Sequence, residues 1–242
     1  MSDVINLEEK ARENIKAIIF DMDGLMFDTE KLWGEAYKEV AKKWGLETKI
    51  TEEVRNSCRG RCIKEIRKLF KELVDEMYLE REGREFPFEE YMNEHVEYIG
   101  EHINNNGISI KEGLIELLKY AHENNLKTAM ATSSEIERVQ YYLEKAGINR
   151  NQFDAIICGD MVQKGKPEPD VFIKACEDLS VSPEESIVLE DSLNGIIAAY
   201  KAGTNPIMVV DCVEPTDEIR SMLCTNPLNS LVEVKRILET MK

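Results

Sequence analysis

The feature that most constrains this sequence is a regular alternation of short apolar runs with longer amphipathic segments. The apolar runs have the length of strands, and the segments between them carry apolar residues at helical spacing. This alternation predicts an α/β fold with a mostly parallel sheet. We expect strands at Lys16–Phe20, Leu126–Ala131, Ala155–Cys158, Ser186–Leu189 and Pro206–Val210, and helices at Glu112–Asn124, Glu135–Ala146, Asp170–Leu179 and Leu193–Ala202.

One long block interrupts the alternation. Leu32–Asn106 contains helical patterns, such as Ile63–Tyr78 and Pro87–Ile103, but no convincing strand. The Asn104–Gly107 cluster is typical of a linker or turn. We therefore predict a core interrupted by a helical insertion just after its first strand, over the carboxyl ends of the strands, where open α/β sheets bind ligands. The expected boundaries are 1–31 and 107–242 for the core and 32–106 for the insertion.

The charge of the chain limits its partners. Its 47 acidic and 31 basic residues give a net charge of −16. A field of this sign repels nucleic-acid phosphates, so we expect no nucleic-acid partner. A phosphate ester would need local positive charge, from a metal ion or a few placed cations. No apolar run reaches the roughly 18 residues of a membrane span. With no secretory signal in the sequence, we expect a cytoplasmic protein, and a monomer by default.

The first predicted strand ends in a pair of carboxylates. Asp21 and Asp23 follow four apolar residues, and Gly24 allows the chain to turn sharply after them. Residues two apart in an extended chain project to the same side, so both carboxylates would face one crevice. Such a pair suits a nucleophile beside a general acid/base, or a shared cation. The alternative is a surface turn, where Asp and Gly are common.

Polar residues also follow the second and third predicted strands. Thr132 and Ser133 place hydroxyls where they could donate to a phosphate oxygen, unless Ser133 or Ser134 caps the next helix instead. Lys166 lies in a loop that the prolines on both sides of Glu168 stiffen. A fixed ammonium there could pair with a carboxylate and with a phosphate, although a lone lysine in a turn is usually solvated.

The fourth predicted strand ends in two more acids, Glu190 and Asp191. Carboxylate oxygens are ligands that Mg²⁺ prefers. Asp191 could instead cap the following helix. Each of these features is weak alone. Because all of them lie at the carboxyl ends of predicted strands, together they predict a site for phosphate chemistry that holds Mg²⁺.

Four ordered motifs resemble those of the haloacid dehalogenase superfamily, in particular its branch of β-phosphoglucomutase-like proteins and small sugar-phosphate phosphatases. They are Asp21-x-Asp23-Gly24, Thr132, Lys166 and Glu190-Asp191. Asp28-Thr29-Glu30 and Gly165–Asp170 look like extended motif forms of this branch. The resemblance covers nearly the whole chain. It implies a Rossmann-like core with a parallel β-sheet and an inserted α-helical cap domain.

The resemblance also implies a role for each matching residue. Asp21 would attack phosphorus, and Asp23 would protonate the leaving oxygen and then activate water. The phosphoryl group would be bound by Thr132, Ser133 and Lys166. The Mg²⁺ ligands would be Asp21, Asp23, Asp191 and Glu190. The implied activity is hydrolysis of a small phosphorylated metabolite, such as a sugar or polyol phosphate, through an aspartyl-phosphate.

Other activities stay open. A mutase of the β-phosphoglucomutase type would have a histidine where Trp33 stands, and a dehalogenase would not need Asp23. A phospho-acceptor signalling or binding domain also places Asp, Thr and Lys at strand ends, but it explains neither the insertion nor the Asp-x-Asp pair. We therefore favour a phosphatase. The cap residues that set its specificity stay open, with Arg59, Arg61 and Lys64 as candidates.

Overall fold

A five-stranded parallel sheet forms the centre of the core in this computed structural model, which describes residues 15–240. The strand order is β3-β2-β1-β4-β5, and all neighbours run parallel. The strands are β1 (Ala17–Phe20), β2 (Lys127–Ala131), β3 (Ala155–Ile157), β4 (Ser186–Glu190) and β5 (Asn205–Met208). The predicted fold class is confirmed, and each predicted strand lies within two residues of the observed bounds.

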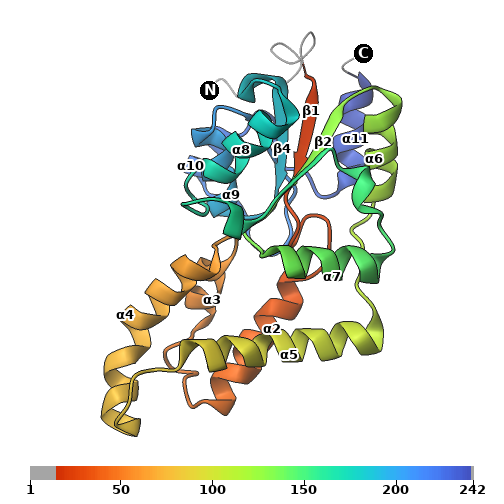
Figure 1. Ribbon diagram of the computed structural model, residues 1–242. Coiled ribbons are helices and arrows are strands. Elements are labelled where there is room, and N and C mark those ends of the chain that lie inside the picture. Colours follow the sequence, from red (N-terminus) through yellow and green to blue (C-terminus); the bar gives the residue numbers. More distant parts are fainter. Residues whose placement is uncertain (1–14, 241–242) are drawn as a thin grey trace.

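The central strands are buried on both faces, and their side chains alternate between two hydrophobic clusters. On β1, Ile18 and Phe20 join one cluster, whereas Ala17 and Ile19 join the other. Burial on both faces explains why the strands are continuous apolar runs in the sequence. Different helices cover the two faces (Figure 1). They are α6 (Leu114–Glu123), α7 (Ile136–Ala146) and α11 (Leu231–Thr240) on one side, and α8 (Asp170–Leu179) and α9 (Leu193–Lys201) on the other.

Four of the five α-helices between β1 and β2 form the insertion, which we call the cap (Figure 1). Its own hydrophobic cluster is rich in aromatic residues, including Tyr37, Phe70 and Tyr91. The cap therefore has a core separate from that of the sheet. No helix within residues 15–240 is both long enough and apolar enough to cross a bilayer. The cap helices are α2 (Glu30–Lys43), α3 (Glu52–Cys58), α4 (Ile63–Glu82) and α5 (Phe88–Asn106), and a short α10 (Asp217–Met222) completes the core.

The end of α5 differs from the sequence prediction. The sequence predicts a linker at Asn104–Gly107, but the helix includes all three asparagines and ends at Asn106, with Gly107 as its C-cap at a φ of 80°. Tertiary packing holds this last turn, because Ile103 is buried against the core cluster. The Asn106 side chain also donates to the His102 carbonyl at 3.0 Å. The predicted linker is therefore wrong over its first three residues, and the boundaries of the insertion at 32 and 106 stay a prediction.

Candidate functional site

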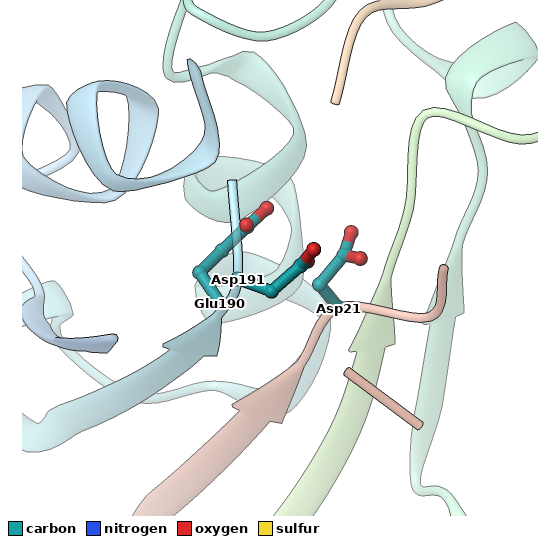
Figure 2. A group of neighbouring side chains, drawn as sticks. All are labelled: Asp21, Glu190 and Asp191. Carbon is teal, nitrogen blue, oxygen red and sulfur yellow. The ribbon is translucent and has the colours of Figure 1, made fainter. Parts of the chain in front are cut away.

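Three carboxylates meet at the carboxyl ends of two neighbouring strands (Figure 2). Asp21 follows β1, whereas Glu190 and Asp191 come from the end of β4, which pairs with β1. One oxygen from each lies within 4.8 Å of the others, and all three side chains are buried. The structure thus brings together three of the acids that the sequence places at strand ends.

Lys166 lies against this acidic group and is 0% exposed. Its ammonium forms ion pairs with Asp21 and, at 2.6 Å, with Glu190, and it donates to the Ala131 carbonyl at 3.2 Å. These acceptors satisfy all three donors of the ammonium. Burial alone would lower the pKa of Lys166, but the attraction of Asp21 and Glu190 outweighs burial and raises it. Lys166 therefore stays charged and neutralises part of the acidic group.

The acidic group keeps an excess of negative charge despite this lysine. Burial raises the pKa of Asp21, against the lowering effect of Lys166 and together with repulsion from Glu190. Burial, followed by repulsion from Glu190, also raises the pKa of Asp191. Carboxylates that are buried this close together resist ionisation unless a cation joins them. The electrostatics of the site therefore favour an additional positive charge.

The hydrogen bonds indicate which oxygens are open to such a cation. Both Glu190 oxygens are engaged, Oε1 by Lys166 and Oε2 by the backbone N–H and hydroxyl of Ser192 at 2.8 and 2.9 Å. Asp191 Oδ1, in contrast, is buried with no partner in the described part of the chain. A buried acceptor without a partner costs free energy that a bound cation would remove. The group fits a hard divalent cation, with Asp21 and Asp191 as the better placed ligands and Glu190 orienting Lys166.

Asp23 lies beside this group and lines the adjoining cavity. Its Oδ1 accepts a hydrogen bond from the Thr29 hydroxyl at 2.7 Å, and its Oδ2 accepts one from the Ser134 hydroxyl at 2.8 Å. Gly24 follows with a φ of 82°, and a Cβ on it would lie 2.2 Å from Asp191 Oδ2. Only glycine therefore allows the turn after the Asp-x-Asp pair to pass so close to the acidic group.

The two predicted phosphate-binding hydroxyls have different neighbours. Thr132 is buried, and its Oγ1 accepts from the Ser134 backbone N–H at 3.1 Å, so its own proton can serve another acceptor. The Ser133 hydroxyl donates to the Gly60 carbonyl of the cap at 2.8 Å. If Ser133 binds phosphate, its backbone N–H would be the donor. Phosphate binding by Ser133 stays a prediction.

The capping alternatives for the strand-end residues are wrong. Helix α7 begins after Glu135, and neither serine before it caps the helix with its side chain. Helix α9 is capped by Ser192, whose hydroxyl accepts from the Gly195 N–H at 3.0 Å, and not by Asp191. The strand-end side chains are thus not used up in helix capping, so they can serve a ligand site.

A cavity of about 200 Å³ lies in front of Asp21 and Asp23, between the core and the cap. Two of the predicted specificity candidates, Arg59 and Arg61, line it, whereas Lys64 is exposed and does not. Sequence reasoning missed other cationic and aromatic lining residues. They are Arg55, Arg138, Tyr37 and Trp33, the last considered only as the residue at the mutase histidine position.

The loop between α3 and α4 closes the cavity against the core. Arg59 forms a largely buried ion pair with Glu30, and its backbone carbonyl accepts from the Asn194 side chain at 2.9 Å. Gly60 has a φ of 70°, and a Cβ on it would lie 2.3 Å from the Ser192 hydroxyl. The glycine therefore permits a backbone approach that no other residue would allow without movement.

Comparison with known proteins agrees with this geometry. The profile of the family described as haloacid dehalogenase-like hydrolase matches residues 18–209. A phosphorylated carbohydrates phosphatase of Thermotoga maritima is 29% identical over 235 residues, covering 94% of this chain and 99% of the relative. Hexitol phosphatase B of Escherichia coli is 27% identical over 220 residues, covering 91% and 94%.

A solved structure shares the fold over nearly the full length. The β-phosphoglucomutase of Clostridium difficile superposes with a TM-score of 0.73 at 25% identity, covering 94% of this chain and 97% of that protein. The family match includes both strands that carry the acidic group and the whole cap. The chain therefore belongs to the haloacid dehalogenase-like hydrolases, in the branch close to phosphosugar phosphatases and β-phosphoglucomutases, and is an enzyme of that family.

Proposed function

We propose that this protein is a Mg²⁺-dependent phosphomonoester hydrolase that acts on a small sugar or polyol phosphate through an aspartyl-phosphate on Asp21. The observation that carries this proposal is the buried ion-pair network at the strand ends. Lys166 connects Asp21 to Glu190, and Asp191 presents an oxygen without a partner beside them. A nucleophile, a fixed cation and metal ligands are what phosphoryl transfer on a carboxylate requires.

The chemistry takes two steps. An Asp21 carboxylate oxygen attacks phosphorus, the bond from phosphorus to the ester oxygen breaks, and Asp23 gives that oxygen its proton. Asp23, now ionised, accepts a proton from water as the water attacks the acyl phosphate. Inorganic phosphate leaves, and both aspartates return to their starting states. The two hydroxyls that bond Asp23 support this role, because they restrict the orientation of its carboxylate beside the cavity that Asp23 lines.

The remaining residues bind and neutralise the phosphoryl group. The Lys166 ammonium already contacts Asp21. It can therefore stabilise negative charge as that charge shifts from the Asp21 carboxylate to the equatorial oxygens of the phosphoryl group. The Thr132 hydroxyl and the backbone N–H of Ser133 would add hydrogen-bond donors. Asp21, Asp191 and the backbone carbonyl of Asp23 would hold Mg²⁺. When bound there, Mg²⁺ would offset the charge of the ester, which the net charge of the chain would otherwise repel.

The names of the relatives support the substrate class. One acts on phosphorylated carbohydrates and another on hexitol phosphates, and both align with nearly the full length of this chain. The cavity of about 200 Å³ is small and combines arginine side chains with the Trp33 ring. Such a lining suits a small polyhydroxylated monoester, whose hydroxyls can bond arginine while its carbon face contacts an aromatic ring.

Phosphate release from a panel of sugar, polyol and nucleotide monophosphates tests the proposal, with Mg²⁺ and with EDTA. The Asp21→Asn variant provides the control. We expect release that needs Mg²⁺, is highest for a sugar or polyol phosphate, and is lost in Asp21→Asn. No release from any ester, together with interconversion of hexose 1- and 6-phosphates, would instead identify a mutase.

A further inference from the structure

A chain of hydrogen bonds reaches Asp23 from a residue that the proposed chemistry does not use. The Arg138 guanidinium donates to the Ser134 hydroxyl oxygen at 3.2 Å. That hydroxyl in turn donates to Asp23 Oδ2 at 2.8 Å. Arg138 lies in the first turn of α7, on the core, and lines the cavity in front of the site. One side chain thus connects a core helix to the proposed acid/base, Asp23.

The chemistry of the three groups fixes the direction of this chain. A guanidinium can only donate, so Ser134 Oγ must accept from Arg138. The single hydroxyl proton of Ser134 is then directed to the Asp23 carboxylate. A cation at the start of such a chain polarises the hydroxyl and strengthens the bond to the carboxylate. Without Arg138, the Ser134 hydroxyl could rotate and donate elsewhere.

The position of Arg138 is itself held by the cap. Its guanidinium lies over the Trp33 ring, 4.4 Å from the centroid, and Trp33 belongs to cap helix α2. Within residues 15–240, no carboxylate forms an ion pair with Arg138. Its partners are therefore an aromatic face and a hydroxyl, which restrict its geometry without neutralising its charge.

We propose that Arg138 is a positioning residue, which holds Asp23 through Ser134 in the orientation that protonates the leaving oxygen. The inference rests on the proposed function of Asp23. It also links the cap to the chemistry, because Trp33 keeps Arg138 in place when the cap lies against the core. Arg138 then acts on the reaction without contacting the substrate.

A double-mutant cycle tests this role on the best ester of the panel. We expect Arg138→Met to lower kcat/KM about tenfold, a fraction of what general acid catalysis contributes. Ser134→Ala should cost at least as much, because it breaks the same chain closer to Asp23. The double variant should be no worse than Ser134→Ala alone, since the arginine has nothing left to act through. Arg138→Lys should recover part of the activity.

Aryl phosphates with phenols of increasing pKa give a second readout. Help from an acid matters most for a poor leaving group, so kcat/KM should fall more steeply with phenol pKa in Arg138→Met and Ser134→Ala than in wild type. Lys145→Met is the matched control. It removes a cation that lies over the Tyr141 ring of the same helix and does not line the cavity. It should keep the wild-type slope.

Two results would overturn the inference. The losses in kcat/KM of the two single variants could multiply in the double variant, while kcat/KM depends on phenol pKa with the same slope in all proteins. That result would mean that Arg138 contacts the substrate directly. Wild-type kcat/KM in a folded Arg138→Met protein would mean that it has no role. Thermal unfolding of each variant establishes that it is folded. If Arg138→Met does not fold, Arg138→Lys replaces it in the comparison with wild type. Absence of any ester turnover by wild type would contradict the proposed function, and this inference with it.

Discussion

Among the single residues of the site, Lys166 is the one that balances its negative charge. Its buried ammonium lies between two carboxylates that would otherwise face each other without compensation. The sequence could place Lys166 near these acids, because each follows a predicted strand of one parallel sheet. It could not indicate that Glu190 has both oxygens engaged while Asp191 Oδ1 has no partner, because that difference depends on Ser192 and on side-chain rotamers.

Replacing Lys166 by Met should affect both stability and activity. The variant leaves Asp21 and Glu190 buried without their cation, so its free energy of unfolding at pH 7 should fall by about 3 kcal/mol. This deficit should shrink as the pH falls, because the buried Asp21 then takes up a proton. We expect kcat/KM to fall at least about 100-fold. Urea unfolding and phosphate release provide the measurements.

Lys201→Met is the matched control for this change. Lys201 pairs with Glu168 at 2.9 Å, but both side chains are exposed by more than 40%. Water and salt screen an exposed pair, so this variant should keep nearly wild-type stability and activity. Equal losses in Lys166→Met and Lys201→Met would show that burial of the Lys166 network is not what matters.

Replacing Asp191 by Asn should separate metal binding from folding. Removing this charge relieves repulsion with Glu190, so in EDTA at pH 7 the variant should unfold at a higher urea concentration than wild type. Mg²⁺ at 100 times its dissociation constant should stabilise wild type by about 2.7 kcal/mol and the variant far less. Equal stabilisation of both proteins by Mg²⁺ would place the metal elsewhere.

At the scale of elements, the sequence predicted the parts whose pattern is local. Strands and most core helices follow from apolar spacing, and so does the absence of strands in the cap. Helix α11 was not predicted, although Leu231, Val234 and Leu238 have helical spacing and are its buried residues. The close approach of Gly60 to the core could not be predicted, because it depends on how the cap packs against the sheet.

The loop between α3 and α4 gives a prediction about that packing. In Gly60→Ala, the new Cβ would meet the Ser192 hydroxyl at 2.3 Å, so the loop must move away from the site. We expect kcat/KM to fall at least about tenfold. Gly83 has nearly the same φ, 69°, but nothing within 4 Å of its Cβ position. Gly83→Ala should therefore cost about 1 kcal/mol of stability, from the same backbone strain, and leave kcat/KM nearly unchanged. Similar kinetics for the two variants would contradict the role of the loop.

His95 on α5 gives the cap a pH-dependent stability. Burial lowers the pKa of His95 to about 4, because the charged ring would lose its hydration between Tyr37 and Tyr91. The unfolded chain binds a proton near pH 6.5, so the stability that the neutral ring contributes is present above that pH. It is lost as the pH falls toward 4, by roughly 3 kcal/mol at most.

Urea unfolding at about pH 7.5 and pH 4.5 measures this contribution. Wild type should lose more stability between these pH values than His95→Phe, in which nothing titrates at that position. His102→Phe changes an exposed histidine of the same helix and should behave like wild type. A pH dependence in His95→Phe equal to that of wild type would show that His95 titrates normally.

At the scale of the whole molecule, the cap and the charge of the chain act together. A chain with a net charge of −16 repels a phosphate ester in general, so binding must rely on a small enclosed space with fixed cations. The cap supplies Arg59 and Arg61 to the lining of that space, and the buried Lys166 of the core lies behind it, against Asp21. The sequence predicted the insertion over the site, but the arginines on its helices and loops resemble ordinary solvated charges until the two parts are brought together.

In the proposed reaction, the phosphoryl group forms a covalent bond to Asp21 before it is released as phosphate. The most direct test is to quench the protein in acid during turnover with Mg²⁺ and the best ester, and to measure the mass of the peptide that contains Asp21. We expect part of this peptide to gain the mass of one phosphoryl group on Asp21, and no such peptide to form in Asp21→Asn. Phosphate release at the wild-type rate by Asp21→Asn, with no phosphorylated peptide in either protein, would contradict the proposed reaction.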